Sequence, residues 1–267
     1  MEKNRYIEEL CTEEPIIRYG STSKKDVRKI QEWIKLWNKK DPSWLEDTAV
    51  DGDFGPHTLD VVKAFQEHFQ LTVDGIVGNK TWRKLTEPMR LAFTRINDKK
   101  PLREMIVAYA EQQLASTPME LHNNGGPWVR AYMNGNEGED QPWCMGFVRT
   151  VVDQATFTNE IPLKSIIPDT VSCDELAEFG LKYGKLIRKE TVRQDYSQVK
   201  PGDLFIIYKN DDVKWVHTGI IVKVDKSKIT TIEGNTNEGG SREGVEARKR
   251  IRDLAIHNID VYKVTND

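Results

Sequence analysis

The chain contains the stretch VDGDFGPHT at residues 50–58 and repeats its pattern, V-D-G-x-x-G-x-x-T, as VDGIVGNKT at residues 73–81. In each copy the Asp-Gly pair favours a tight turn, because glycine accepts a positive φ, and the threonine is a common residue at a helix start. Apolar residues recur at helical spacing before the first copy, at 27–37, and after it, at 62–69. The sequence therefore predicts three helices joined by two similar turns between about residues 19 and 85.

Length and composition predict two folded domains. The chain has 267 residues, of which 38% are hydrophobic and 30% are charged, and such fractions are typical of proteins with a packed core. The net charge of −3 argues against a nucleic-acid partner held by bulk positive charge. No stretch approaches the roughly 20 apolar residues of a membrane span, and residues 1–17 lack the pattern of a signal peptide. We therefore expect synthesis in the cytoplasm and no membrane insertion.

The rest of the chain changes from helical to strand-like patterns. Apolar spacing predicts helices over 102–114 and 144–155. After residue 200, apolar runs of strand length occur at 204–208, 216–224, 229–233 and 258–264. Helices followed by an antiparallel sheet are the α+β pattern, so we expect a small all-α domain followed by an α+β domain. We place the first domain at residues 1–88, a polar linker at 89–101 and the second domain at 102–267.

Cys144 is the first candidate for a chemical role. It follows Pro142-Trp143 and begins the predicted helix 144–155, and a helix N-terminus stabilises a thiolate. The polar, Gly-rich stretch before it predicts an exposed approach. Three cysteines at wide, irregular spacing match neither a disulfide framework nor paired zinc ligands. We interpret Cys173, which stands before a helix predicted from Asp174, as structural.

A strand hairpin is predicted to supply the base and a carboxylate that orients it. If Val224 pairs with Lys228 across a three-residue turn, His217 lies opposite Asn235, and Glu233 lies opposite Gly219 on the same face. His217 and Glu233 are then diagonal neighbours, with room between them at the glycine. A slip of one residue would turn Glu233 to the other face. We interpret the remaining histidines as surface or loop residues: His57, His68, His122 and His257.

Metal sites are weaker alternatives. Asp51 and Asp53 look like the start of a calcium loop, but the twelfth position is Val62 where an EF-hand needs glutamate. A zinc site from Cys173, His122 and His217 lacks local ligand spacing. We expect no metal and no other cofactor.

The first domain resembles the three-helix peptidoglycan-binding domain of many cell-wall hydrolases. The resemblance is carried by Ile30-Gln31 and by residues 50–55, 62–66 and 71–82. It implies a helical module that docks on cell-wall sugar or peptide. The contacts that we expect there are Asp51, Phe54, Gln66 and Asp74.

The second domain resembles the CHAP amidase/peptidase family, within the papain-like and NlpC/P60-like group, over about residues 102–264. The carrying residues are Pro142-Trp143-Cys144, Pro201-Gly202-Asp203-Leu204, His217-Thr218-Gly219-Ile220 and Glu233-Gly234-Asn235. The family often has Gln directly before its cysteine, where this chain has Trp143. The resemblance implies Cys144 as nucleophile, His217 as general base and then acid, Glu233 as orienting carboxylate and Asn235 as a polar helper. We also expect substrate contacts at Trp143 and Trp215.

These features predict a peptidoglycan hydrolase that cuts an amide bond of the stem peptide or cross-bridge through a Cys-His-Glu site. The absence of an export signal fits a phage endolysin, and it fits an antibacterial effector with a delivery system and an immunity protein. In both cases the enzyme would act at the bacterial cell wall after release or delivery. Two alternatives stay open: a non-catalytic wall-binding or phage structural protein with a hydrolase-like fold, and a thiol acyltransferase that passes the acyl group to an amine.

Overall fold

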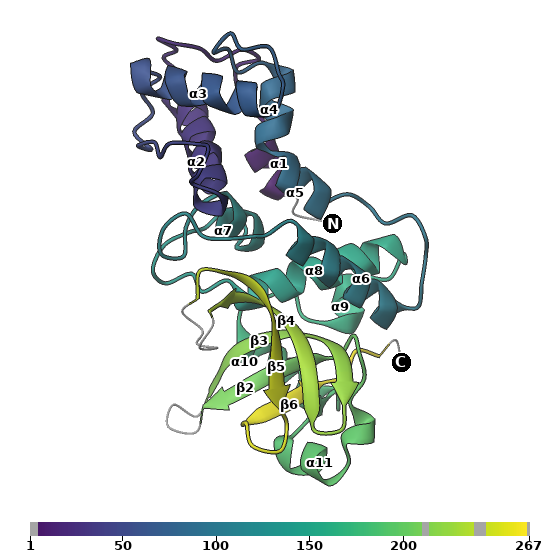
Figure 1. Cartoon of the computed structure of the whole chain (residues 1–267). Helices are drawn as coiled ribbons and strands as arrows, with labels where there is room; N and C mark the ends of the chain where they lie inside the picture. The colour runs from purple at the N-terminus through teal and green to yellow at the C-terminus, as the bar shows by residue number, and fades with distance from the viewer. Residues whose placement is uncertain (1–4, 210–213, 238–243, 266–267) are drawn as a thin grey trace.

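The N-terminal lobe is helical and folds around the repeated turns. The computed structural model describes residues 5–209, 214–237 and 244–265. The three predicted helices are present as α2 (Lys24–Lys40), α3 (Pro56–His68) and α4 (Asn79–Leu85), and two short helices, α1 (Arg5–Leu10) and α5 (Glu87–Ala92), lie close to them (Figure 1). Val27, Ile30 and Ile34 of the predicted apolar face are fully buried. The prediction of three helices in this lobe is therefore confirmed.

A buried glutamine closes each repeated turn. In each copy, a glutamine of the preceding helix donates to the Asp side chain, at 2.8 Å in the first and 3.0 Å in the second, and accepts the glycine N–H at 2.8 Å. The two glycines have φ of 78° and 71°, a region that favours glycine. The repeat is therefore a structural unit in which the glutamine satisfies buried backbone groups. The first turn uses Gln31, Asp51 and Gly52, and the second uses Gln66, Asp74 and Gly75.

The C-terminal lobe is the predicted α+β domain. Its antiparallel sheet has six strands in the order β1-β6-β2-β3-β4-β5. The strands are β1 (Leu186–Ile187), β2 (Leu204–Lys209), β3 (Lys214–Asp225), β4 (Lys228–Thr236), β5 (Glu246–Asp253) and β6 (Ile259–Tyr262). The helices are α6 (Leu102–Ala115), α7 (Pro127–Tyr132), α8 (Cys144–Thr158), α9 (Leu163–Ile166), α10 (Cys173–Lys182) and α11 (Lys189–Gln194). Helices α6, α7 and α8 lie between the sheet and the N-terminal lobe (Figure 1).

The hairpin of β3 and β4 has the predicted register at Ile220, but its turn differs from the predicted one. Asp225 pairs with Lys228, so the turn has two residues and the pairing beside it is shifted by one from the prediction. A bulge at Val222 then absorbs one residue, and Ile220 pairs with Ile232 as predicted. The prediction is therefore wrong at the turn and correct at Ile221 and Ile220, where the recorded pairing of β3 with β4 ends. Because side chains alternate along a strand, this correction keeps Glu233 on the required face.

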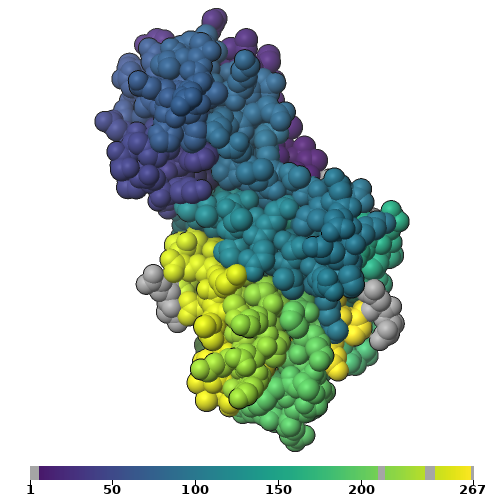
Figure 2. Space-filling model, turned by 45° about the vertical axis from the view of Figure 1, so that its right-hand side comes forward, coloured from purple at the N-terminus to yellow at the C-terminus, as the bar shows by residue number. Residues whose placement is uncertain are grey.

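The two lobes share one core and form a continuous body (Figure 2). Trp33 of α2 packs edge-on against Trp128 of α7, with 6.2 Å between ring centroids. The first residues of the predicted linker belong to α5, where Met89 and Ala92 are fully buried. The carbonyl of Ala92 accepts hydrogen bonds from Gln113 and Gln154. The start of that segment is therefore packed into the second lobe. Within the described residues, no helix is both long and apolar enough to cross a membrane.

Candidate active site

Helix α8 positions Cys144 at its first residue, as predicted. Phe147 N–H donates to the carbonyl of Trp143 at 2.9 Å and closes the first turn. The first N–H groups of a helix have no partner within the helix, and they and the helix dipole favour negative charge at this end. Cys144 exposes only 3% of its surface. The polar stretch before it is largely exposed, as predicted, but Cys144 itself is buried because α8 is buried from its first turn.

Glycines allow α8 to lie close to its neighbours. A Cβ added at Gly234 would stand 2.7 Å from Phe147 Cβ and 2.8 Å from the indole of Trp143. At Gly146 it would stand 2.7 Å from the carbonyl oxygen of Tyr132. Contacts below 3.0 Å are too short for a real Cβ, so larger residues would push α8 away from β4 and α7. These two glycines set the position of the helix that carries Cys144.

His217 and Glu233 meet as the hairpin predicts. His217 Nε2 lies 2.8 Å from Glu233 Oε2, and both residues are almost fully buried. A Cβ at Gly219 would lie 2.8 Å from Glu233 Cγ, which confirms that glycine leaves the room this pair needs. The Nδ1 atom of His217 is buried and has no hydrogen-bond partner among the described residues. Glu233 therefore holds one ring nitrogen and leaves the other for a different group.

Arg252 and Thr231 complete the surroundings of Glu233. Arg252 donates from Nε to Oε1 at 2.6 Å and from Nη2 to Oε2 at 2.5 Å. Thr231 donates its hydroxyl to Oε1 at 2.5 Å. Burial raises the pKa of Glu233, but Arg252 and then His217 outweigh it and lower the value to about 2. The carboxylate is therefore ionised over the whole working range of pH.

The thiol and the imidazole shift each other's pKa. The pKa of Cys144 is lowered well below its usual value, first by its contact with Cys173 and then, against burial, by the charge of His217. Burial lowers the pKa of His217, but contacts with Cys144 and Glu233 outweigh it and raise the value to about 9. The two shifts therefore favour the thiolate of Cys144 and the imidazolium of His217.

Two regions of the chain match models of known families. Residues 23–85 match the putative peptidoglycan binding domain, and residues 136–235 match the CHAP domain. The chain carries a peptidoglycan-binding domain followed by a CHAP domain. Comparison with curated proteins and with solved structures found no match. The two domains support a cell-wall hydrolase role, that of a peptidoglycan amidase or peptidase with peptidoglycan as its partner.

Asn235, Trp143 and Trp215 lie around the site of the CHAP domain in different settings. Asn235 donates from Nδ2 to Asn124 Oδ1 at 3.3 Å, and its own Oδ1 is buried without a hydrogen-bond partner. Trp143 is fully buried and stacks on Tyr132 at 5.4 Å. Trp215 is half-buried and donates its indole N–H to Asp260 at 2.8 Å. Substrate contacts by the two tryptophans stay predictions, and Trp143 would have to leave its packing to make one.

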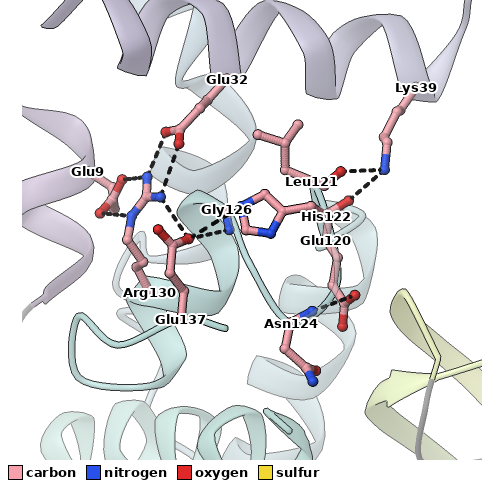
Figure 3. A network of polar contacts seen from close by, with 10 residues as sticks. All are labelled: Glu9, Glu32, Lys39, Glu120, Leu121, His122, Asn124, Gly126, Arg130 and Glu137. Carbon is pink, nitrogen blue, oxygen red and sulfur yellow. Dashed lines mark hydrogen bonds and ion pairs between the residues drawn. The ribbon is translucent and has the colours of Figure 1, made fainter. Parts of the chain in front are cut away.

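Sequence reasoning missed Glu120, which supports the residue before the nucleophile. Its Oε1 accepts the indole N–H of Trp143 at 2.7 Å, and its Oε2 accepts the backbone N–H of Asn124 at 3.0 Å. Burial raises the pKa of Glu120. Lys39, in the last turn of α2, donates to the carbonyls of Glu120 and Leu121 at 3.2 and 2.8 Å (Figure 3). The peptidoglycan-binding domain therefore holds a segment on which Trp143 depends.

Arg130 forms a second connection between the domains. From α7 it makes paired hydrogen bonds of 2.9 and 2.8 Å to Glu9 and of 3.1 and 2.7 Å to Glu32. It also donates to Glu137 at 3.0 Å, and Glu137 accepts the N–H of Gly126 (Figure 3). Three carboxylates around one guanidinium fix the segment 120–137, which contains α7, against α1 and α2.

The expected wall contacts divide into exposed and buried residues. Asp51 and Asp74 are exposed, whereas Phe54 and Gln66 each show 1% of their surface. Gln66 uses its amide to close the second turn, as described above. Their roles in wall binding stay predictions. Among the described residues, no group of three or more His, Cys, Asp or Glu side chains is arranged to hold a metal ion.

Proposed function

We propose that the chain is a cysteine-dependent peptidoglycan amidase or endopeptidase in which Cys144, His217 and Glu233 act together. The observation that carries the proposal is the 2.8 Å contact of His217 Nε2 with Glu233, which leaves the buried Nδ1 for the sulfur of Cys144. A carboxylate on one nitrogen fixes the orientation of the ring and stabilises its charged form. The lowered pKa of Cys144 and the raised pKa of His217 support the same pairing.

The reaction follows from these roles. The thiolate of Cys144 attacks the carbonyl carbon of the scissile amide, and a C–S bond forms as the carbonyl oxygen becomes negative. Backbone N–H groups at the start of α8, beside Cys144 in the sequence, would donate hydrogen bonds to that oxyanion. The C–N bond then breaks, and the imidazolium of His217 gives its proton to the leaving amine. Water, deprotonated by the neutral imidazole, hydrolyses the thioester and restores the ion pair.

The peptidoglycan-binding domain would bring this site to its polymer. Asp51 and Asp74 stand exposed on the two turns and are the side chains we propose to contact the wall, while Phe54 and Gln66 shape the turns from inside. The enzyme would act at the bacterial cell wall either as a phage endolysin or as a delivered antibacterial effector. Both settings require the same bond cleavage, so the chemistry can be tested without choosing between them.

The test is digestion of purified peptidoglycan followed by mass spectrometry of the products. We expect the unmodified protein to cut one type of amide bond. Cleavage within the peptides would leave new N-termini, and cleavage between sugar and peptide would leave free lactyl groups. Cys144→Ala should keep binding to insoluble wall and release no product. Cleavage by Cys144→Ala at the original rate would overturn the proposal, as would unchanged lysis after complete alkylation of Cys144 with iodoacetamide. Added amines that appear in the products in place of water would identify an acyltransferase instead.

A further inference from the structure

Cys173 lies beside the nucleophile, although its sequence context indicated a structural cysteine. Its Sγ is 3.9 Å from the Sγ of Cys144, a distance within the range of a sulfur hydrogen bond. The two residues are separated by 28 others in the chain and reach this place from the starts of two different helices, α8 and α10. Both are buried, with exposed fractions of 3% and 8%. The pair therefore interacts in a region of low dielectric, where electrostatic contacts are strong.

The first turn of α10 is attached to the strand that carries His217. Ser172 caps this helix by accepting the N–H of Glu175 at 3.4 Å. Asp174 Oδ1 accepts the backbone N–H of Trp215 at 2.7 Å, two residues before His217 in β3. These bonds place the sulfur of Cys173 relative to both the imidazole and the nucleophile. A cysteine that only filled space in the core would not need such a connection to the catalytic strand.

Two helix N-termini converge on the sulfur pair. Cys144 is the first residue of α8, with 15 residues, and Cys173 is the first residue of α10, with 10 residues. Each helix presents the positive end of its dipole and its first N–H groups at this point. The arrangement favours one negative charge on the pair. A thiol is a weak donor and a thiolate is an acceptor, so the neutral partner can donate its proton to the charged one.

We propose that Cys173 is a second catalytic thiol, which donates its S–H to the sulfur of Cys144 and thereby keeps the nucleophile ionised in the resting enzyme. This inference rests on the proposed function, because it assigns Cys173 a part in the reaction of Cys144. The hydrogen bond is strongest to the thiolate and weakens when the sulfur becomes an uncharged thioester. Cys173 therefore increases the ionised fraction of the nucleophile and gains or loses no covalent bond during the cycle.

A thiolate stabilised in this way is also a weaker nucleophile. The logarithm of the rate constant of a thiolate falls by about 0.4–0.5 for each unit by which the pKa of its thiol is lowered. A lower pKa therefore speeds the reaction only at pH values where it increases the ionised fraction of the thiol. Removing Cys173 should therefore slow the enzyme at acidic pH and make it faster at alkaline pH, where Cys144 is ionised in both proteins. A residue that only supports the fold would lower the rate by a similar factor at every pH. The crossing of the two pH profiles separates the roles.

The experiment measures the ionisation of Cys144 directly. Full-length protein is treated with iodoacetamide between pH 4 and pH 9, and the alkylation rate of the peptide that contains Cys144 is followed by mass spectrometry. The variants are Cys173→Ala, which removes the donor, and Cys173→Ser, which keeps a hydroxyl donor at the same place. Circular dichroism and thermal unfolding confirm that each variant is folded. The rate kcat/KM on a soluble muropeptide is measured over the same pH range.

We expect the midpoint of the Cys144 alkylation profile to rise by about one pH unit in Cys173→Ala, a tenfold lower thiolate fraction below the midpoint. Cys173→Ser should restore the original midpoint, and the kcat/KM profiles of Cys173→Ala and the unmodified protein should cross. Identical alkylation midpoints in the unmodified protein and Cys173→Ala would overturn the inference. Alkylation does not require hydrolysis, so this result is independent of the proposed function, which fails instead if Cys144→Ala still cleaves peptidoglycan.

Discussion

Arg252 and Glu233 form a buried ion pair joined by two hydrogen bonds. The two bonds measure 2.6 and 2.5 Å, and the same carboxylate accepts from His217 at 2.8 Å. The guanidinium also lies 4.9 Å from the ring of Phe205. Bidentate pairing fixes the plane of the carboxylate as well as its charge. Arg252 is therefore a positioning residue that acts on His217 through Glu233.

Replacing Arg252 by methionine should impair both folding and catalysis. Removing one partner of a buried pair leaves an uncompensated charge, which costs about 3–5 kcal/mol of unfolding free energy. We expect the double variant Arg252→Met, Glu233→Gln to recover much of that stability, because it leaves no buried carboxylate without its guanidinium partner, while its rate stays low. Urea unfolding and kcat on a soluble muropeptide measure the two effects. A double variant no more stable than Arg252→Met would show that the pair does not act as a unit.

The pKa of His217 predicts the alkaline limit of the reaction. Contacts with Cys144 and Glu233 raise this pKa to about 9, so the imidazolium is present below that value and is lost as pH rises through it. The leaving amine needs that proton, and kcat/KM should therefore decline as pH rises through about 9. Glu233→Gln removes the charge that stabilises the imidazolium and should move the alkaline limb to lower pH. An alkaline limb that stays in place in Glu233→Gln would contradict the assignment.

Lys39 offers a test of the connection between the domains. It lies in the peptidoglycan-binding domain and holds the carbonyls of Glu120 and Leu121, and Glu120 in turn holds Trp143 beside the nucleophile. Lys39→Met should lower kcat on a small soluble substrate about threefold to tenfold, equivalent to the loss of about 1 kcal/mol in one hydrogen-bonded contact. Binding to insoluble wall should not change. The neighbouring Lys40→Met is the matched control, and an equal loss in both variants would argue against a specific connection.

The helical lobe and the hairpin could be predicted from sequence because local rules decide them. Turn residues fix the two repeats, and alternation fixes the face of Glu233 once the register is right. The bulge at Val222 was not predictable, since a two-residue turn plus one extra residue gives the same pairing at Ile220 as a three-residue turn without a bulge. The predicted face of Glu233 is therefore correct, although the predicted turn is not.

Arg252 and Cys173 could not be assigned because long-range packing brings them to the site. Strand β5 was not predicted, although its sequence EARKRIRD places arginines at alternate positions 248, 250 and 252. Such alternation indicates one strand face with a shared role, and it was the available signal for a partner of Glu233. Cys173 carries no comparable signal. Its position depends on how α10 docks against β3, which neighbouring residues in the chain do not reveal.

Replacing the two glutamines of the repeated turns should lower stability, and comparing the two variants tells a structural role from a role in wall binding. Gln66→Ala leaves the buried N–H of Gly75 without its 2.8 Å partner, which costs about 1–3 kcal/mol. Gln31→Ala should cost a similar amount at Gly52, because its bonds are equivalent. Chemical unfolding gives the stability, and sedimentation with insoluble wall below the unfolding transition gives binding. If Gln66→Ala abolished binding in a folded protein while Gln31→Ala did not, Gln66 would be a wall contact in addition to its role in the turn.

The 3.9 Å separation of the sulfurs of Cys144 and Cys173 predicts how the enzyme responds to oxidation. We expect hydrogen peroxide to convert Cys144 to a sulfenic acid, which Cys173 attacks with release of water. The net reaction joins two thiols in a disulfide and reduces one peroxide to two waters. Activity should fall as the disulfide forms and return fully with dithiothreitol. In Cys173→Ser the same treatment should drive Cys144 to sulfinic acid, and the loss should then be irreversible. Tandem mass spectrometry identifies the cross-linked peptides, and a disulfide to the exposed Cys11 in their place would refute the proximity of the pair.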